Sequence, residues 1–398
     1  MASVNDLSFV QAAAILNELK SQATGQKSLT PINNLGDWIS VATTTLATGY
    51  DPVMGAISLV LGRTVNSERP YGGKFKGLQR DSQAFGAYTR KLSFVDLPMV
   101  ESKQFDLADN TSVDPYIIRK KPVLQTNIYG GDDYQYFETI TKDQLHTAFQ
   151  NPESFSDFMG ARAVNMQNNL TQTREMKSRA VIADLITGRI AGAEEGLAPE
   201  SVVHLLTEYK NETGLTDLTP QTVKQPENYP AFIKWVYGRV EQICELMTER
   251  SQIFQTNVTD KPINRHTERP YQRLFIQDQA LKMMTSRVLA DTFHENMLNM
   301  SVTEGVNFWQ SIESPFDISA QPAYMAANGT IKSSAAPVEA TEVFGLIMDR
   351  DAAGLTLINE ETNYTPYNPR GKYWNLFHTG LWRWWADFTE KSVVLLLD

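Results

Sequence analysis

The sequence predicts an α+β fold, in which helices and strands follow one another without a regular βαβ repeat. Helical periodicity recurs in residues 152–187 and 229–254, and short apolar runs typical of buried strands occur at 274–276 and 343–348. The chain has 398 residues, of which 42% are hydrophobic and 21% are charged. It is therefore long and apolar enough to bury a sizeable core, over two or three domains.

The first 121 residues alternate between helical, polar and extended character. Residues 4–20 predict a short amphipathic helix. Residues 21–36 are polar and favour an arm or linker, whereas residues 38–61 do not decide between helix and strand. Residues 63–121 alternate, contain several glycines and have little apolar bulk. We expect them to form a long two-stranded hairpin that leans on another surface, the alternative being a large surface loop.

One unusually long helix is predicted over residues 152–187. Asn151 is a suitable N-cap, Pro152 stands at the first helical position, and Glu153 places an acid in the first turn. Gly188 is expected to end the helix, which gives roughly 50 Å at about 1.5 Å per residue. Its polar middle indicates that one side is exposed to water.

The elements around this helix are shorter. Residues 123–137 before it have strand composition, and residues 190–226 after it are irregular. Beyond the helix predicted at 229–254 and the strand at 274–276, residues 277–293 predict another helix. The run at 343–348 predicts a buried strand, and residues 355–358 are its candidate partner strand.

The end of the chain is its most apolar part, because residues 393–397 are all apolar and four of the seven Trp follow residue 370. Chain ends usually fray unless something holds them, so we expect a strand in a sheet or packing against a partner. The residues expected to pack there are Tyr373, Trp374, Trp382, Trp384 and Trp385. If the ring of Trp384 is buried in this sheet, Trp384→Ala should destabilise the protein by about 3–5 kcal/mol.

Charge and motif content exclude several function classes. A net charge of −10 argues against the chain gripping nucleic acid, since such binding relies on Lys and Arg, and an acidic wall would repel packed DNA. No apolar run is long enough for a membrane span. Cys244, the only cysteine, is interpreted as a small buried hydrophobe.

No catalytic, cofactor-binding or metal-binding residue is predicted. The five His are scattered, and the sequence lacks a Cys-x-x-Cys pair and a phosphate-binding glycine loop. Adjacent acids are interpreted as solvated loop residues; they occur at Asp132 and Asp133, Glu194 and Glu195, and Glu360 and Glu361. The triple Asp349-Arg350-Asp351 could begin a metal site, but a charged turn after a buried strand is favoured.

Basic residues gather in and around the predicted hairpin. For the run Arg119-Lys120-Lys121, pairing with a neighbour's acids is favoured over a nucleic-acid patch or a solvated face, because interleaved aromatic residues are lacking and the chain is acidic overall. The candidate inter-subunit residues are Arg69, Lys74, Lys76, Arg80, Arg90, Lys91, Arg119, Lys120 and Lys121.

The order of elements and one C-terminal motif resemble a known family. The motif is Asn368-Pro369-Arg370-Gly371 followed by Tyr373-Trp374-Asn375. The order of elements resembles that of the major capsid proteins of tailed bacteriophages, which have the Hong Kong 97-type fold. The motif is similar to the one in the capsid proteins of phi-29-like short-tailed phages. The resemblance implies four parts: an N-terminal helix and arm (1–50), an extended loop (63–121), a peripheral domain with a spine helix (122–187 plus 371–398) and an axial domain (188–370).

The resemblance also implies a function. The protein would assemble into an icosahedral or prolate head shell around double-stranded phage DNA, in the bacterial host cytoplasm, without enzymatic activity or cofactors. Its partners would be itself, in hexamers and pentamers, and portal and scaffolding proteins. Deleting residues 72–90 of the extended loop should leave a soluble, folded subunit that fails to close shells. The alternatives are an encapsulin-like bacterial compartment shell and, in a different class, a hydrolase using an acid pair.

Overall fold

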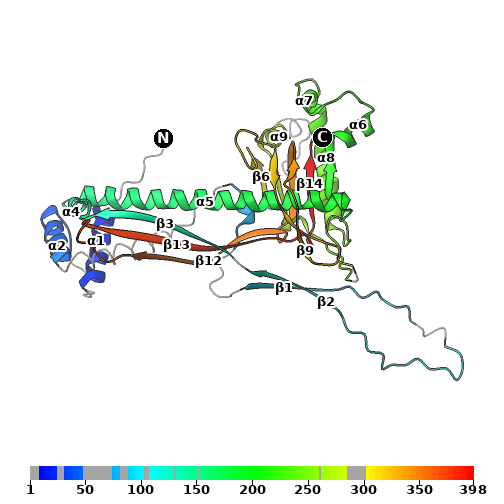
Figure 1. Cartoon of the computed structure of the whole chain (residues 1–398), viewed down its shortest axis with the longest axis horizontal. Coiled ribbons are helices and arrows are strands. Elements are labelled where there is room, and N and C mark those ends of the chain that lie inside the picture. The colour runs from blue at the N-terminus through cyan, green and yellow to red at the C-terminus, as the bar shows by residue number, and fades with distance from the viewer. Residues whose placement is uncertain are drawn as a thin grey trace.

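The protein is elongated (Figure 1). The computed structural model describes residues 9–24, 31–47, 74–80, 88–102, 107–129, 131–150, 152–259, 261–284 and 302–398. Helix α5 (Pro152–Glu194) runs along the length of the molecule, with the N-terminal helices at one end and a mixed lobe of helices and strands at the other. A long loop reaches away beyond the lobe. The α+β class predicted from sequence is confirmed.

Helix α5 has 43 residues, or about 65 Å at ~1.5 Å per residue. Its predicted end at Gly188 is wrong, because the helix continues to Glu194. Gly188 is instead a packing position: a Cβ there would lie 2.4 Å from Cζ of Phe388. The helix ends before Gly196, whose φ of 78° is in the left-handed region that favours glycine.

Substitution of Gly188 should therefore behave unlike an ordinary helical Gly→Ala change. We expect Gly188→Ala to lower the free energy of unfolding by about 1–3 kcal/mol, because the new methyl group overlaps Phe388. Gly160 lies in the same helix with nothing within 4 Å of its Cβ position, so Gly160→Ala should stabilise by up to about 1 kcal/mol. Urea unfolding of the two variants tests this, and an equal gain in stability from both would contradict it.

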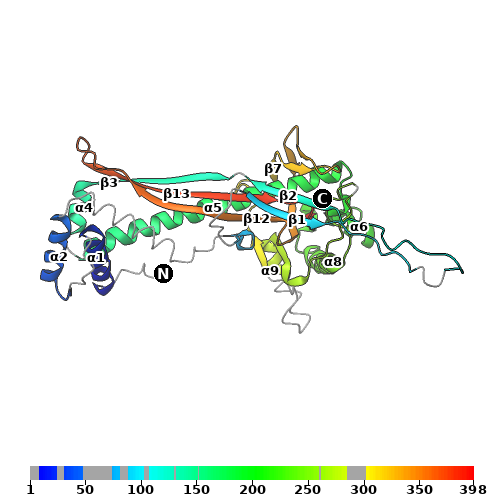
Figure 2. The same ribbon diagram turned by 90° about the horizontal axis from the view of Figure 1, so that it is seen from below.

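A long three-stranded antiparallel sheet accompanies α5 (Figure 2). Its order is β12 (Ala353–Tyr364), β13 (Tyr373–Ala386) and β3 (Asp132–Thr141). Every second residue of β13 from Trp374 to Trp382 is buried, as expected for a strand with one face covered. Ion pairs of Arg162 with Glu138 and of Lys177 with Asp132 join the helix to β3.

The lobe is built on a five-stranded sheet. Its order is β4 (Val202–His204), β14 (Ser392–Leu396), β11 (Val343–Asp349), β5 (Gln272–Gln277) and β6 (Val302–Val306). β14 runs parallel to β4 and antiparallel to β11, β11 runs antiparallel to β5, and β5 runs parallel to β6. The predicted strand at the chain end and those at 274–276 and 343–348 are confirmed.

This sheet is covered on both faces. Val394 and Leu396 of β14 pack in the cluster that contains α5 residues, whereas Val393 and Leu395 pack in the cluster that contains residues of α8 (Tyr229–Thr248). A strand buried on both faces has a continuous apolar sequence rather than an alternating one. This explains why residues 393–397 are uniformly apolar.

Strand partners differ from the sequence-based expectation in two places. Residues 355–358 are not the partner of β11, because they belong to β12 in the other sheet. Residues 123–137 form two strands in different sheets, β2 (Val123–Tyr129) and the beginning of β3. Gly131 lies between them, where a Cβ would stand 2.7 Å from the carbonyl oxygen of Trp382. β12, from the range 188–370, thus pairs with β13, from the range 371–398, and the division into four parts stays a prediction.

The N-terminal helices pack on the far end of α5 rather than extending away. The predicted helix at 4–20 corresponds to α1 (Phe9–Thr24), and residues 1–8 lie outside the described residues. The undecided segment 38–61 is helical as far as Ala47, in α2 (Leu35–Ala47). The ring of Trp38 in α2 meets that of Phe155 in α5 at 5.3 Å.

The remaining elements are short. Helix α8 ends six residues before the predicted 254, and of the helix predicted at 277–293 the part beyond 284 lies outside the described residues. The other helices are α4 (Lys142–Ala148), α6 (Leu205–Thr213), α7 (Pro220–Val223), α9 (Asp278–Met283) and the 3₁₀ turns η1 (Lys76–Leu78), η2 (Pro199–Ser201) and η3 (Arg269–Tyr271). The small strand pairs are β7 (Ile318–Ala320) with β10 (Val338–Ala340), and β8 (Ala323–Met325) with β9 (Ile331–Ser333).

Candidate assembly interface

The predicted hairpin is present, but its paired part is short and displaced along the chain. β1 (Tyr88–Phe94) pairs antiparallel with β2, which lies beyond the predicted limit of residue 121. Residues 74–80 lie in the body and not in the hairpin: Phe75 and Leu78 are fully buried in the core. Deletion of residues 72–90 would therefore damage the fold, which corrects the sequence-based expectation.

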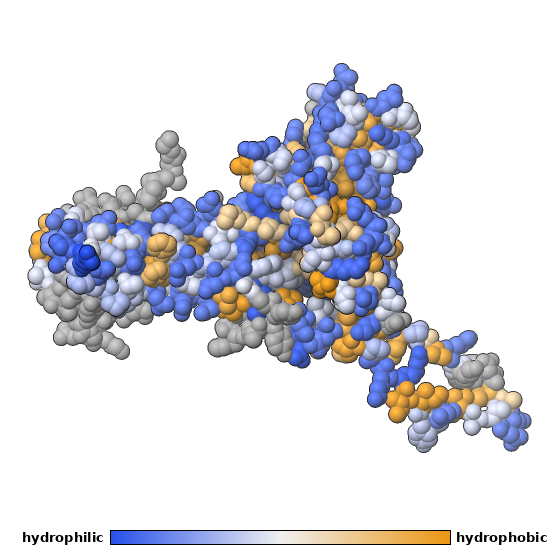
Figure 3. Space-filling model, in the orientation of Figure 1, coloured by the Kyte–Doolittle hydropathy of each residue, from blue (hydrophilic) through white to orange (hydrophobic). Residues whose placement is uncertain are grey.

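Between β1 and β2 the chain forms what we call the projecting loop, residues 97–121. Every described residue from 97 to 123 is exposed. Met99 is 99% exposed, Tyr116 86% and Ile118 82%, and a band of apolar surface follows the loop in Figure 3. The other exposed apolar residues of the loop are Leu97, Val100, Leu107, Val113 and Ile117. Contiguous apolar exposure of this kind marks surfaces that another molecule covers.

The nine basic residues divide into three groups. Lys74 donates to the carbonyl oxygen of Gly305 at 3.0 Å and Arg80 pairs with Asp351 at 3.4 Å, so these two contact their own subunit. Lys91 also pairs within the subunit, with two acids described below. Arg90, Arg119, Lys120 and Lys121 are exposed. Arg69 and the side chain of Lys76 lie outside the described residues.

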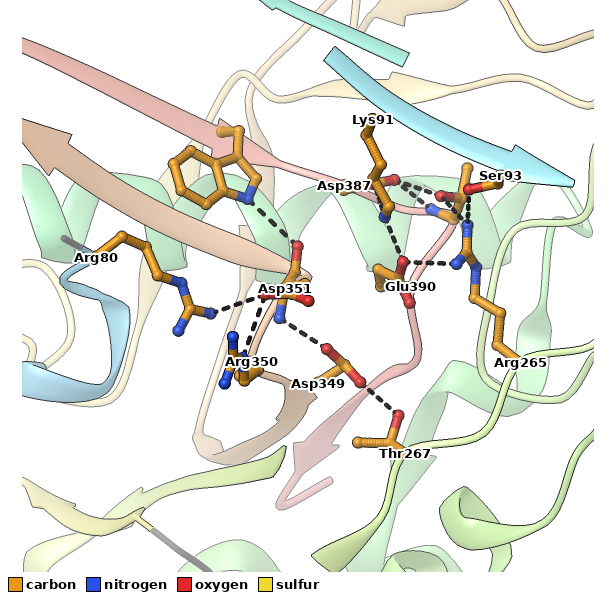
Figure 4. Close-up of polar contacts among 12 residues, drawn as sticks. Arg80, Lys91, Ser93, Arg265, Thr267, Asp349, Arg350, Asp351, Asp387 and Glu390 are labelled. Carbon is orange, nitrogen blue, oxygen red and sulfur yellow. Dashed lines mark hydrogen bonds and ion pairs between the residues drawn. The ribbon is translucent and has the colours of Figure 1, made fainter. Parts of the chain in front are cut away.

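A compact charge cluster lies at the base of the projecting loop (Figure 4). Lys91 of β1 pairs with Asp387 at 2.5 Å and with Glu390, and Arg265 pairs with Glu390 at 2.7 Å. The side chains of Asp387 and Glu390 are only 3% and 10% exposed. Two cations therefore neutralise two buried carboxylates.

The two carboxylates of this cluster differ in their electrostatics. Burial acts to raise the carboxyl pKa of Asp387, but Lys91 and hydrogen bonds from Thr389 outweigh it and hold that pKa below its ordinary value. For Glu390 burial dominates over Lys91 and Arg265, so its pKa lies above the ordinary value. The cluster thus depends on the presence of both cations.

The five aromatic residues lie in β13, beside the long helix, and not in the terminal strand β14. Trp374 is fully buried, and its ring meets that of Tyr367 at 4.7 Å. Trp382 is buried beneath the guanidinium of Arg174, 4.7 Å from the ring centroid. Trp384 is only half-buried, so it is not the position of largest expected loss. Tyr373 and Trp385 are also half-buried.

Two of the acid pairs lie in strands and not in the predicted loops. Asp132 and Asp133 are neighbours in β3, and Glu360 and Glu361 are neighbours in β12, so the two members of each pair point to opposite faces of a sheet. Asp349 accepts hydrogen bonds from Thr267 and from the amide of Asp351, as in the charged turn favoured above. Within the described ranges, no group of three His, Cys, Asp or Glu side chains is placed to hold a metal ion.

Two side chains of types that often take part in catalysis, Cys244 and His378, are buried in the subunit. Cys244 is buried, as predicted, and burial raises the pKa of its thiol to about 12. His378 is also buried, with Nε2 2.9 Å from Glu360 and Nδ1 2.9 Å from Thr362. Sequence reasoning missed this triple because it depends on the register between β12 and β13.

Among the helices that the structure describes, none is long and apolar enough to cross a bilayer.

Comparisons with known proteins agree with this architecture. The family model of the Phi29-like phage major capsid protein matches residues 12–379. The structure titled capsid structure of Staphylococcus phage Andhra contains a similar chain (TM-score 0.52, 9% identity, 83% of this chain and 86% of that chain covered). A chain in the structure of head fiber and inner core protein of native bacteriophage P68 is also similar (TM-score 0.51, 8% identity, 83% and 86% covered).

No curated protein matches the chain. The two structural similarities support the tailed-phage capsid fold, and the family match disfavours both the compartment-shell and the hydrolase alternatives. Since the family model covers nearly the whole chain, the protein belongs to the Phi29-like phage major capsid protein family, whose members build the head shell of the virion.

Proposed function

We propose that the projecting loop of each subunit lies on a neighbouring subunit and joins the copies of this major capsid protein into the head shell. The observation that carries this proposal is the exposure of the loop's apolar residues, Met99, Tyr116 and Ile118 above all. The exposed bases Arg119, Lys120 and Lys121 follow directly and supply charge for a neighbour's acids.

The same proposal extends to the assembly as a whole. The subunits form hexamers and pentamers of a closed shell, because symmetric closure multiplies many modest contacts. The shell encloses double-stranded DNA without sequence-specific binding, in keeping with the net charge of −10. Assembly takes place in the bacterial host cytoplasm with portal and scaffolding proteins, and the protein's role is structural rather than enzymatic.

Polar substitution of the loop tests the proposal. In Tyr116→Ser with Ile118→Ser, each contact loses apolar burial worth about 1.5–3 kcal/mol per side chain. The concentration needed for assembly should therefore rise by at least about tenfold. Light scattering and negative-stain microscopy measure assembly, and urea unfolding should show an unchanged subunit.

The matched control is Ile312→Ser in the lobe, where Ile312 is 75% exposed and the change in polarity is similar. It should assemble like the unmodified protein if the loop is the interface. Equal assembly of the loop variant and the unmodified protein would contradict the proposed role of the loop.

A further inference from the structure

We infer that Lys91 and Asp96 are two anchors of a clamp within the subunit, which sets the direction in which the projecting loop leaves the body. Lys91 was expected to contact a neighbouring subunit, and its observed partners assign it this internal role instead. The clamp goes beyond the proposed function, because it concerns a single subunit and can be measured without assembly.

The first anchor is the charge cluster around Lys91. Its side chain reaches from β1 to Asp387 and Glu390, in the turn that joins β13 to β14 (Figure 4). Arg265 completes the cluster, because it pairs with Glu390 and also donates to Ser93 Oγ of β1 at 3.0 Å. The inward side of β1 is thus held at three alternate positions. Thr89 accepts from Arg383 of β13 at 3.3 Å, Lys91 pairs with the turn after β13, and Ser93 accepts from Arg265.

The second anchor is Asp96, just beyond the end of β1. Its carboxylate accepts from Arg250 at 2.6 Å and from the backbone amide of Asn264 at 2.8 Å. Its own amide donates to the carbonyl oxygen of Pro262 at 3.0 Å. Three separate hydrogen bonds therefore hold this residue to the segment that follows α8.

The chain changes character directly after Asp96. Val95 is buried, and its amide donates to the carbonyl oxygen of Pro122 in the returning limb at 3.0 Å. Leu97 and the described residues from there to residue 123 are exposed. Within the loop, Thr111 donates to the carbonyl oxygen of Ala108, and the amide of Tyr116 donates to the carboxylate of Asp114. Both bonds stay inside the loop and do not join it to the body. Residues 91 and 96 lie about 17 Å apart along an extended chain at ~3.4 Å per residue. Two anchors at this separation define a direction, whereas a single anchor would leave a pivot.

The Lys91 part of the first anchor can be removed while the contacts of Arg265 and of Asp96 stay in place. Lys91→Met alone would strand a buried carboxylate, which is costly. Lys91→Met combined with Asp387→Asn leaves Arg265 and Glu390 as a balanced pair, and the Asn side-chain oxygen can still accept from Thr389. The single variant Lys91→Arg keeps a positive charge at position 91 and serves as the conservative control. Lys120→Met is the matched control, because it makes the same change at an exposed lysine of the projecting loop.

Two measurements on unassembled subunits test the clamp. Backbone amides of β1 should exchange with deuterium at least about tenfold faster in the double variant, while those of β11 and β14 stay protected. Spin labels at Ser112→Cys in the loop and Gln221→Cys in α7 should report a broader distance distribution; both positions are exposed, whereas Cys244 is buried. Lys91→Arg and Lys120→Met should resemble the unmodified protein in both measurements.

Unchanged β1 exchange and an unchanged distance distribution in the double variant would overturn the clamp. Equally faster exchange throughout β1, β11 and β14 would also overturn it, since the cluster would then support general stability rather than loop direction. Failure of the unmodified protein to form shells would instead reject the proposed function and leave the clamp measurable.

Discussion

Trp374→Ala is expected to lower the free energy of unfolding by about 3–5 kcal/mol. Trp374 is fully buried in β13, and it belongs to the cluster in which α1, α2 and the beginning of α5 pack against the long sheet. Removing its ring leaves a cavity between elements that are distant in sequence, and their side chains cannot collapse into it fully. Urea unfolding followed by circular dichroism measures the loss.

Trp385→Ala is the matched control for this prediction. Trp385 lies in the same strand but is half-buried, so the same truncation removes less buried surface and should cost clearly less. Losses of equal size at the two positions would show that burial in this cluster does not determine the effect.

Excision of residues 98–120 is expected to abolish closed shells and leave a folded subunit. The described residues of this segment are exposed, and Val95 and Pro122 are joined by a backbone hydrogen bond of 3.0 Å. A linker of about four Gly and Ser residues can therefore close the gap at small entropic cost. Electron microscopy should show no shells, while the unfolding midpoint stays close to that of the full chain.

A contrasting deletion separates the loop from the body. Removal of residues 74–80 deletes Phe75 and Leu78 from the core and should prevent folding altogether. Normal particles from the 98–120 excision would exclude a role for the loop in assembly. An unfolded product of that excision would show instead that the loop contributes to the core.

The helix start and the buried strands could be predicted because their signals are local. Pro152 opens α5 as its sequence position indicated, and the apolar run at the chain end is a strand with both faces covered. Gly188 misled the prediction for a physical reason. A glycine ends a helix when φ is positive but also permits close packing, and only the position of Phe388 distinguishes these roles.

The candidate interface was predictable in part. The position of the loop followed from composition, but its limits did not, because residues 74–80 look polar and basic and yet place Phe75 in the core. Lys91 could not be assigned from sequence, since its partner Glu390 is 299 residues away. A lysine that pairs with two buried acids of its own subunit has the same local sequence signature as a lysine that pairs with an adjacent subunit.

The sequence by itself determined the start of the long helix, the presence of helix α8 and of the buried strands at 274–276 and 343–348, and the family that the C-terminal motif resembles. Only the tertiary structure decided that β14 pairs with β4 and β11, that β12 belongs to the long sheet, and that three of the basic residues hold their own subunit. The physical reason is that side-chain periodicity records how much of a segment is buried. The identity of the burying partner depends on contacts between segments hundreds of residues apart.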